Sequence, residues 1–359
     1  MELLSVTMND GVMPRSEIEG KDNSSEDKSN YKVVLTGDMV YNSMRMWQGA
    51  NGISPCDGIV SPAYTVLMPK IPISNGYFAA LFKSSNLINE FRKNSQGMTS
   101  DTWNLKYPQI ETIKVCIPAL SEQNRVADML DTLERRIAKQ AKLVDSLKKY
   151  KRGLLSREFG KQENGDLSNR YIGKLKDYFH LSSGSTPSST NKAFYSGNIR
   201  WVSSGELKPK YLCETSQHIS SEAVSSCNLR VYPANTLLIA MYGLEAAGVR
   251  GTASILSVPA TISQACMAIQ QAGEIDIEYL YYWYIYNGQW IGIRIAQGTK
   301  QQNLSTDTLG SLRIYAPSYS NQKEVCKLLS QIDYLIEKES KKFDLISSVK
   351  RGLLQQLFI

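Results

Sequence analysis

The sequence lacks the patterns on which most metal sites, disulfide frameworks and membrane anchors depend. It has two histidines, and its six cysteines are scattered without any Cys-x-x-Cys pair, so neither a zinc site nor a disulfide framework is indicated. We expect the cysteines to be small buried residues. No run approaches the roughly 18 apolar residues of a membrane span, and the first residues lack the basic and apolar regions of a signal peptide. These absences predict a cytoplasmic protein with no metal, no cofactor and no membrane contact.

Catalytic motifs are missing as well. The sequence contains no Gly-x-Gly-x-x-Gly, no Gly-Lys-Ser/Thr phosphate loop, no His-Glu-x-x-His and no Asn/Asp-Pro-Pro-Tyr/Phe tetrapeptide of the methyltransferases. The net charge of +7 suggests a polyanionic partner, but the excess lies largely in residues 118–161, which hold 11 basic and 6 acidic side chains. We therefore predict no catalytic residue, and net charge alone is weak evidence for DNA binding.

What the chain does contain is a long internal repeat. Residues 118–159 align without a gap with residues 317–358, at an offset of 199, and both copies include the run Lys-Arg-Gly-Leu-Leu. Each copy reads as one helix, with Ser121 and Ser320 where an N-cap hydroxyl would satisfy the first-turn N–H groups.

Two glycines occupy equivalent positions near the ends of these helices. Gly153 and Gly352 each cost about 1 kcal/mol in a helix interior. They predict a bend or a close contact at that place.

Apolar residues in both helices recur at alternating spacings of four and three, which is typical of a coiled coil. A helix of about 38 residues is nearly 60 Å long and cannot bury such a stripe alone. We predict that the two stripes pair antiparallel, with Gln140 opposite Glu339 at the centre; the alternative is that each packs onto its own adjacent domain. The residues of the predicted seam include Val126, Leu130, Leu133, Ile137, Gln140, Leu147, Val325, Leu329, Ile332, Ile336, Glu339 and Ile346.

The regions before the two helices are more distantly related. Short β-branched or aromatic runs alternate there with turn residues, at Tyr31–Leu35, Ala63–Leu67, Thr236–Met241 and Met267–Ile269. The predicted fold class is α+β, with two mixed, largely β domains separated by two long helices. The predicted division is a first recognition domain at 1–117, a first spacer helix at 118–160, a linker at 161–170, a second recognition domain at 171–316 and a second spacer helix at 317–359.

The two halves differ in one respect. The second has about 30 residues, Tyr171–Arg200, that find no counterpart before Leu4. We expect the first domain to lack its opening segment, through truncation or a late start.

Polar loops interleaved with aromatic residues are the candidate nucleic-acid contacts. Hydroxyls and backbone N–H groups suit phosphates, and Arg, Asn and Gln side chains can bond purine edges. Loop 297–303 is the strongest single candidate because it has long polar side chains and almost nothing apolar, although each loop also reads as an ordinary surface turn. The candidates are Asn42, Arg45, Trp47, Gln48, Ser183, Gly184, Thr186, Tyr242, Arg250, Gln297, Thr299, Lys300, Gln301 and Asn303.

Taken together, these features resemble the specificity subunit of type I restriction-modification enzymes over nearly the whole chain. The resemblance lies in two dissimilar domains that are each followed by a helix ending in Lys-Arg-Gly-Leu-Leu-x-x-x-Phe, in the helix start at Leu120–Gln123, and in the run Gly184–Pro187. The second helix departs from the family with Asn321, where Glu is frequent.

The resemblance implies that each domain reads one half of a split site in double-stranded DNA, with the antiparallel helices fixing the gap. It implies that two methyltransferase subunits, which carry S-adenosylmethionine and methylate adenine at N6, dock around the helices. It also implies that restriction subunits, driven by ATP, join for cleavage. The chain itself would be a non-catalytic subunit. The alternative function is a coiled-coil scaffold that joins two protein-binding modules.

Overall fold

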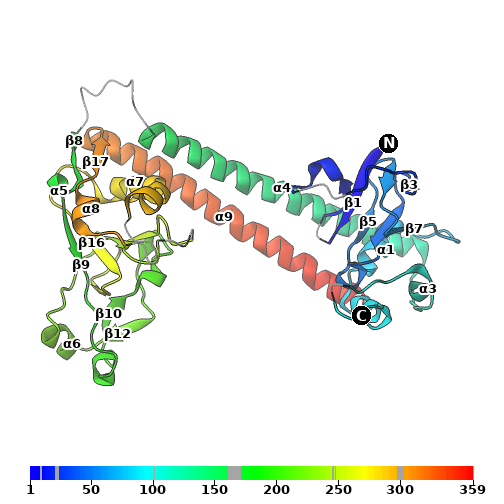
Figure 1. The fold of residues 1–359 in the computed structure, drawn as a ribbon, viewed down its shortest axis with the longest axis horizontal. Coiled ribbons are helices and arrows are strands. Elements are labelled where there is room, and N and C mark those ends of the chain that lie inside the picture. The colour runs from blue at the N-terminus through cyan, green and yellow to red at the C-terminus, as the bar shows by residue number, and fades with distance from the viewer. Residues whose placement is uncertain are drawn as a thin grey trace. The chain divides into compact units, whose positions relative to one another are not determined.

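The computed structural model describes residues 1–8, 10–20, 24–100, 102–160, 171–244, 246, 248–296 and 303–358. The chain forms two compact units, of which unit 1 is Met1–Val144 with Lys338–Ile359 and unit 2 is Asp145–Glu337. Part of each long helix, α4 (Leu120–Phe159) and α9 (Tyr319–Leu357), belongs to each unit (Figure 1). Within the described residues, no helix is long and apolar enough to cross a membrane.

Unit 1 is built on two small sheets, with strand orders β2-β1-β6-β3 and β5-β4-β7. The first closes over a core that includes Leu4, Val34 and Val60, and the second packs on helices through Met39 and Tyr41. The strands are β1 (Glu2–Thr7), β2 (Gly11–Pro14), β3 (Lys32–Val34), β4 (Met39–Asn42), β5 (Asn51–Ile53), β6 (Gly58–Val60) and β7 (Tyr64–Leu67); the helices are η1 (Arg15–Glu17), η2 (Met46–Gln48), α1 (Asn75–Leu81), α2 (Ser85–Asn94) and α3 (Tyr107–Ile110).

Unit 2 has a five-stranded sheet of order β11-β14-β13-β16-β9, a three-stranded sheet of order β12-β10-β15, and the pair β17-β8. Its strands are β8 (Tyr171–Lys174), β9 (Phe179–Ser183), β10 (Ile199–Val202), β11 (Tyr211–Leu212), β12 (Gln217–Ile219), β13 (Leu237–Ala240), β14 (Ala253–Leu256), β15 (Thr261–Ile262), β16 (Cys266–Gln271) and β17 (Arg313–Ala316). Its helices are α5 (Leu175–Tyr178), η3 (Lys192–Tyr195), η4 (Ser204–Glu206), α6 (Ser221–Ser226), α7 (Ile277–Trp290), the π-helical turn η5 (Ile291–Ile295) and α8 (Thr306–Gly310). All four strands expected from β-branched runs are present, as β3, β7, β13 and β16.

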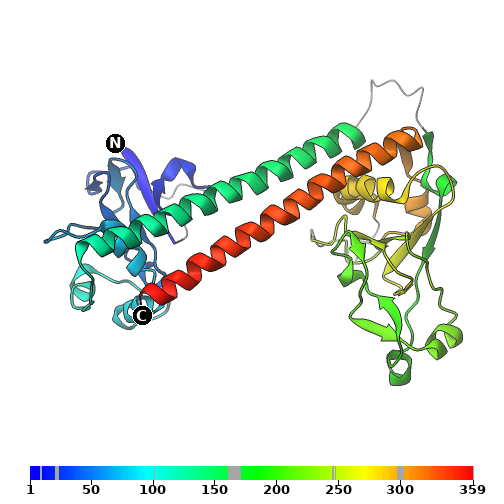
Figure 2. The same cartoon turned by 180° about the vertical axis from the view of Figure 1, so that it is seen from behind.

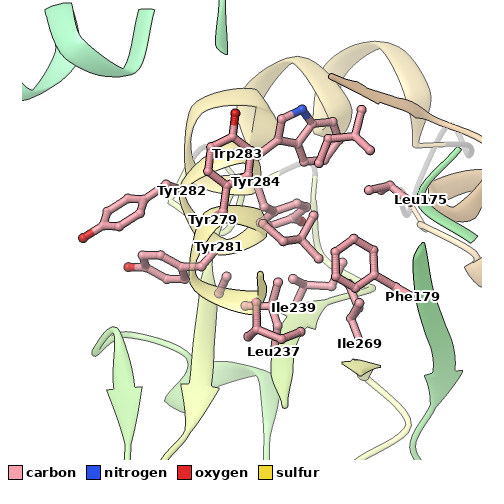
Figure 3. Packing of buried hydrophobic residues seen from close by; sticks show 14 of the residues in the cluster. Leu175, Phe179, Leu237, Ile239, Ile269, Tyr279, Tyr281, Tyr282, Trp283 and Tyr284 are labelled. Carbon is pink, nitrogen blue, oxygen red and sulfur yellow. The ribbon is translucent and has the colours of Figure 1, made fainter. Parts of the chain in front are cut away.

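Helix α7 forms the centre of the unit 2 core. Tyr279, Tyr282 and Tyr284 are at most 2% exposed, and the cluster around them includes Leu237 and Ile269 of the sheet (Figure 3). A helix that is apolar on nearly every side is stable only when other elements cover it. Here the sheet and the long helices do so.

The strand pairings show that the duplication extends to both domains. β1 pairs parallel with β6 as β10 pairs parallel with β15, and β4 lies antiparallel between β5 and β7 as β13 lies between β14 and β16. Unit 2 also has β8, α5 and β9, for which the described residues of unit 1 hold no counterpart.

Helices α4 and α9 run antiparallel within each unit, as predicted (Figure 2). At the seam centre in unit 1, the Gln140 Nε2 donates to Glu339 Oε2 at 2.6 Å and to the Glu339 carbonyl at 3.0 Å. The residues predicted for the seam are all buried or half-buried.

Polar residues interrupt the apolar seam at two equivalent places in each helix, Gln140 and Lys151 in α4 and Glu339 and Lys350 in α9, and the lysines also have polar partners. Lys350 forms an ion pair with Glu134 at 2.6 Å in unit 1, and Lys151 forms one with Asp333 in unit 2. These two pairs are equivalent under the 199-residue offset. A lysine at each seam interruption is therefore neutralised by the opposite helix.

The ends of the helices bind the domains in the same duplicated way. The Phe358 ring packs on Tyr77 in unit 1 with centroids 5.3 Å apart, and the Phe159 ring packs on Tyr279 in unit 2 at 5.1 Å. Each unit thus joins one domain to the start of its own helix and to the end of the other.

The start of each seam also packs into its adjacent domain, through Val126 and Leu130 in unit 1 and through Val325 and Leu329 in unit 2. Pairing between the two helices, as predicted, and packing of each helix onto its adjacent domain, the stated alternative, therefore occur in different parts of each helix.

A buried glutamine ties each long helix to its domain. The Gln322 Oε1 accepts from the Asp276 N–H at 2.8 Å, and its Nε2 donates to the Pro317 and Glu274 carbonyls at 2.9 and 3.2 Å. In unit 1 the equivalent Gln123 accepts from the Ser74 N–H at 3.0 Å and donates to the Pro118 carbonyl at 2.9 Å.

Three sequence expectations are wrong in detail. Ser121 and Ser320 are not N-caps, because the helices begin one residue earlier, at Leu120 and Tyr319. The carbonyls of Pro118 and Pro317, just before the helices, accept hydrogen bonds from the buried glutamines. Among the described residues, no neighbouring group lies within 4 Å of the place a Cβ would take at Gly153 or Gly352, so the predicted close contact is absent, whereas the alternative, a bend, stays a prediction. Of the cysteines, only Cys266 and Cys326 are buried, and Cys116 and Cys213 are exposed.

Candidate nucleic-acid interface

The loop after β9 in unit 2 holds three of the predicted contact residues together. The Gly184 N–H donates to the Cys266 carbonyl at 3.0 Å, and a Cβ at Gly184 would lie 2.3 Å from the Ser263 carbonyl, so only glycine fits. The Thr186 hydroxyl accepts from the Gln264 N–H at 3.2 Å. Ser183 and Thr186 are exposed. The loop is fixed by the sheet and presents hydroxyls to solvent, as a phosphate contact requires.

A second group surrounds the segment after β13. Tyr242 forms an isolated antiparallel bridge with Asn303, and the Leu304 N–H donates to the Met241 carbonyl at 2.9 Å. Asn303 is exposed, and Tyr242 is half-buried. Gln297, Thr299, Lys300 and Gln301 lie outside the described residues, so their assignment to DNA stays a prediction.

Arg250 lies in the same region and braces a loop. Its Nε donates to the Leu244 carbonyl at 2.7 Å, and a Cβ at Gly292 would come within 2.7 Å of the Arg250 Cγ. The aliphatic part of the arginine therefore packs on the glycine of the π-helical turn. In the described structure this side chain shapes the loop, and a contact of its guanidinium with DNA is untested.

The predicted residues of unit 1 lie around the short helix η2. Asn42 is buried; its Oδ1 accepts from the Met44 N–H at 3.1 Å, and its carbonyl accepts from the Arg45 N–H at 3.0 Å, so it forms the turn. Arg45, Trp47 and Gln48 are half-buried and follow one another around this turn. They form the part of the predicted group that can reach a ligand.

Two residues that the sequence analysis missed complete this unit 1 group. The Trp103 ring meets the Trp47 ring edge to face with centroids 5.1 Å apart, and the Arg92 guanidinium lies 5.6 Å from the Trp47 ring. Arg92 is exposed at the end of α2. Arginine and tryptophan together bind phosphate and stack on bases. Trp103 and Arg92 lie in polar segments that are separate from Trp47 in the sequence, so no local sequence pattern links them to it.

A third cluster in unit 2 joins Asp276, Glu278 and Cys326, whose ligand atoms lie within 4.8 Å of one another. Lys323 pairs with Asp276 at 2.5 Å, and Lys210 pairs with Glu278, so cationic side chains already neutralise both carboxylates. Burial raises the pKa of the Cys326 thiol, which disfavours the thiolate. We assign this cluster to the packing of α7 against α9.

Comparison with known proteins places these features in a family context. The model of the family described as "Type I restriction modification DNA specificity domain" matches residues 6–149 and 171–346. The MjaIX specificity subunit of a type I restriction enzyme from Methanocaldococcus jannaschii is 28% identical over 192 residues, which are 52% of this chain and 43% of that protein. The EcoR124I/EcoR124II specificity subunit from Escherichia coli is 25% identical over 224 residues, 60% of this chain and 53% of that one. The matched part of the chain thus spans about half the length of these two relatives.

A solved structure shares the fold. The S subunit of a type I restriction-modification system from M. genitalium superposes with a TM-score of 0.61 at 15% identity, covering 91% of this chain and 84% of the other. Identity this low supports likeness of fold alone.

Proposed function

The chain belongs to the family of type I restriction-modification DNA specificity domains, and from this premise we propose that it confers DNA sequence specificity on a type I restriction-modification complex. In this proposal it binds double-stranded DNA, does no bond chemistry and acts in the cytoplasm. The observation that carries the proposal is the duplicated design, in which each unit joins a domain with exposed polar loops to the start of one helix and the end of the other.

Each unit would read one half of a split site, with the shared helix pair setting the gap. Duplicated readers on one chain favour two half-sites at a defined separation, because binding of the first makes binding of the second intramolecular. The loop of Gly184 and Thr186 supports this role in unit 2, and the group of Arg45, Trp47 and Arg92 supports it in unit 1. The two domains are nearly neutral, so bound subunits would supply part of the phosphate contact.

The outer faces of the long helices support docking of protein partners. Tyr150 and Val349 are 56% and 46% exposed, and Met129 and Leu328 are 38% and 40% exposed. Each of these pairs is equivalent under the 199-residue offset, so the same apolar feature occurs twice. Single exposed apolar side chains are common on any protein surface, so it is their repetition at equivalent places on both helices that supports docking. We infer that two methyltransferase subunits dock here, and that restriction subunits join for cleavage as the family implies.

Selection of random DNA fragments tests the proposal. The chain is mixed with its methyltransferase partner, bound fragments are retained on a filter, and the enriched sequences are read. We expect two short specific elements separated by a gap of constant length. No enrichment of any sequence would contradict the proposal and favour the scaffold alternative. Turnover by the chain alone, with S-adenosylmethionine or magnesium, would contradict its non-catalytic role.

A further inference from the structure

A closed loop follows helix α2 in unit 1, and we call the segment from Gln96 to Asn104 the unit 1 loop. The Gln96 N–H donates to the Asn104 carbonyl at 3.0 Å, and the Asn104 N–H donates back to the Gln96 carbonyl at 2.8 Å. The Thr102 hydroxyl accepts from the Thr99 N–H at 3.1 Å and donates to the Thr99 carbonyl at 2.9 Å. A Cβ at Gly97 would lie 2.6 Å from the Thr102 carbonyl, so only glycine fits there. The described residues of the loop are therefore held in one shape.

The unit 1 loop begins where loop 297–303 begins in unit 2, and that loop is the strongest candidate contact from the sequence. The run Gln96-Gly97 aligns with Gln297-Gly298 at an offset of 201. In the five residues before each run, the first is buried, the next two are exposed and the last two are half-buried. The two loops therefore start at the same helix end, although residues 297–302 lie outside the described part of the chain.

The two loops also return to the same place in their domains. The Leu105 N–H donates to the Ser43 carbonyl at 2.8 Å, directly after β4. The Leu304 N–H donates to the Met241 carbonyl at 2.9 Å, directly after β13. Both leucines are fully buried. Because start and return agree, the unit 1 loop is the counterpart of the candidate loop in unit 2.

The side chain near the tip differs between the two loops. Met98 is 100% exposed, and the aligned residue in unit 2 is Thr299. A methionine side chain has no hydrogen-bond donor and only a weak acceptor. The major groove admits a two-stranded ribbon, and the thymine methyl is the apolar group that base edges present there. An apolar and a polar side chain at equivalent places suit two half-sites of different sequence.

An unpaired guanidinium lies at the base of the unit 1 loop. Arg92 is exposed, and among the described residues no carboxylate forms an ion pair with it. The next residue, Lys93, is already paired with Glu90 at 2.7 Å. Arg92 is therefore the cation at this helix end that can bind a phosphate.

Trp47 holds this guanidinium in place. The Arg92 guanidinium lies 5.6 Å from the centre of the Trp47 ring. The Trp47 ring meets the ring of Trp103, which belongs to the unit 1 loop, with centroids 5.1 Å apart. The Trp47 indole N–H donates to the Met44 carbonyl at 3.1 Å, so it is not available to DNA. The indole is thus fixed between the loop and Arg92.

We propose that the unit 1 loop reads one half of the split site, with Met98 packed on a thymine methyl group in the major groove and Arg92 bound to an adjoining phosphate. Trp47 is a positioning residue that acts through Arg92. This inference rests on the proposed function and adds to it the base type and the residues that read it.

Removal of single methyl groups from the DNA tests the contact of Met98. The full chain with its methyltransferase partner is titrated with a duplex of the selected motif and with duplexes in which one thymine at a time is deoxyuridine, which lacks the methyl group. One replacement, in one half-site, should weaken binding about fourfold, as expected for one buried methyl group. Met98→Ala should weaken binding to the thymine duplex by about fourfold or more and should not respond to that replacement. Met68→Ala, at another exposed methionine of unit 1, is the matched control and should behave as the unmodified chain.

The outcomes separate this inference from the proposed function. Equal sensitivity to deoxyuridine with and without Met98, or no sensitivity in either protein, would overturn the inference while a selected bipartite motif still supports the proposed function. A selection that enriches no sequence would overturn both.

A salt titration tests the roles of Arg92 and Trp47. Arg92→Gln should reduce the slope of log K against log salt by about one, as for one lost phosphate contact, and should weaken the thymine and deoxyuridine duplexes equally. Trp47→Leu should reproduce this change and add nothing in the Arg92→Gln background, whereas Trp47→Phe keeps an aromatic face and should retain most of the binding. An unchanged slope in Arg92→Gln would remove Arg92 from the phosphate. A further loss in the double variant would overturn the positioning role of Trp47.

Discussion

Replacing Gln322 by Leu tests the duplicated tie between helix and domain. The substitution removes three hydrogen bonds and leaves the N–H of Asp276, a residue only 4% exposed, without an acceptor. An unsatisfied buried donor costs about 1–3 kcal/mol, and the lost bonds add to it, so we expect a total near 3 kcal/mol. The equivalent Gln123→Leu removes two bonds, and its partner Ser74 is half-buried, so water can replace the lost acceptor and the cost is about 1–2 kcal/mol.

The chain has two units, so one unfolding curve is not well defined, and native-state hydrogen exchange measures each unit separately. Gln322→Leu should accelerate exchange in α7 by roughly 100-fold, and Gln123→Leu should accelerate exchange in α1 by roughly tenfold. Gln331→Leu, an exposed position on α9, is the control and should change neither. Equal acceleration by the two buried substitutions, or none in α7, would refute the reasoning.

Three further predictions concern single sites. The hydrogen bond from Gln140 lowers the pKa of Glu339 below its usual 4.5, so the contribution of this bond to stability is present above pH 4.5 and is lost as pH falls through the lowered pKa. Gln140→Leu should raise the pKa of Glu339 in a carboxyl NMR titration. An unchanged titration would contradict the pairing. Gly352→Ala should stabilise unit 1 by about 0.5–1 kcal/mol, since the helix has open space there, and faster exchange at the end of α9 would show otherwise. Gln297→Ala combined with Lys300→Ala should weaken binding at one half-site by about tenfold, measured on DNAs altered in one half at a time, whereas equal loss at both halves would remove this loop from the interface.

The helix pairing was predictable because its signal is periodic and repeated. The four-and-three spacing identifies the seam, and the symmetry of two equivalent helices places Gln140 on Glu339 without any structural knowledge. The buried glutamines were visible as the identical pair Gln123 and Gln322, but they lie outside the seam. Their partners Ser74 and Asp276 are 49 and 46 residues away, so their role depends on tertiary contacts.

The candidate contact loops were less predictable for the same physical reason. Gly184 is required because the Ser263 carbonyl lies 79 residues away in sequence and next to it in space. The Trp47 group depends on Trp103 and Arg92, which come from two other segments. Asn42 has the residue type of a base contact, yet its amide oxygen bonds its own turn. Composition identifies candidates, and the long-range packing decides which of them reach solvent.

Mapping methylated adenines in DNA from cells that contain this chain and its methyltransferase tests the central claim most directly. Two units of the same design that read separate halves predict methylation in a single bipartite motif, with two defined elements and one gap length. Deletion of the gene for this chain should remove that motif. One continuous motif, or methylation that persists unchanged without the chain, would contradict the account.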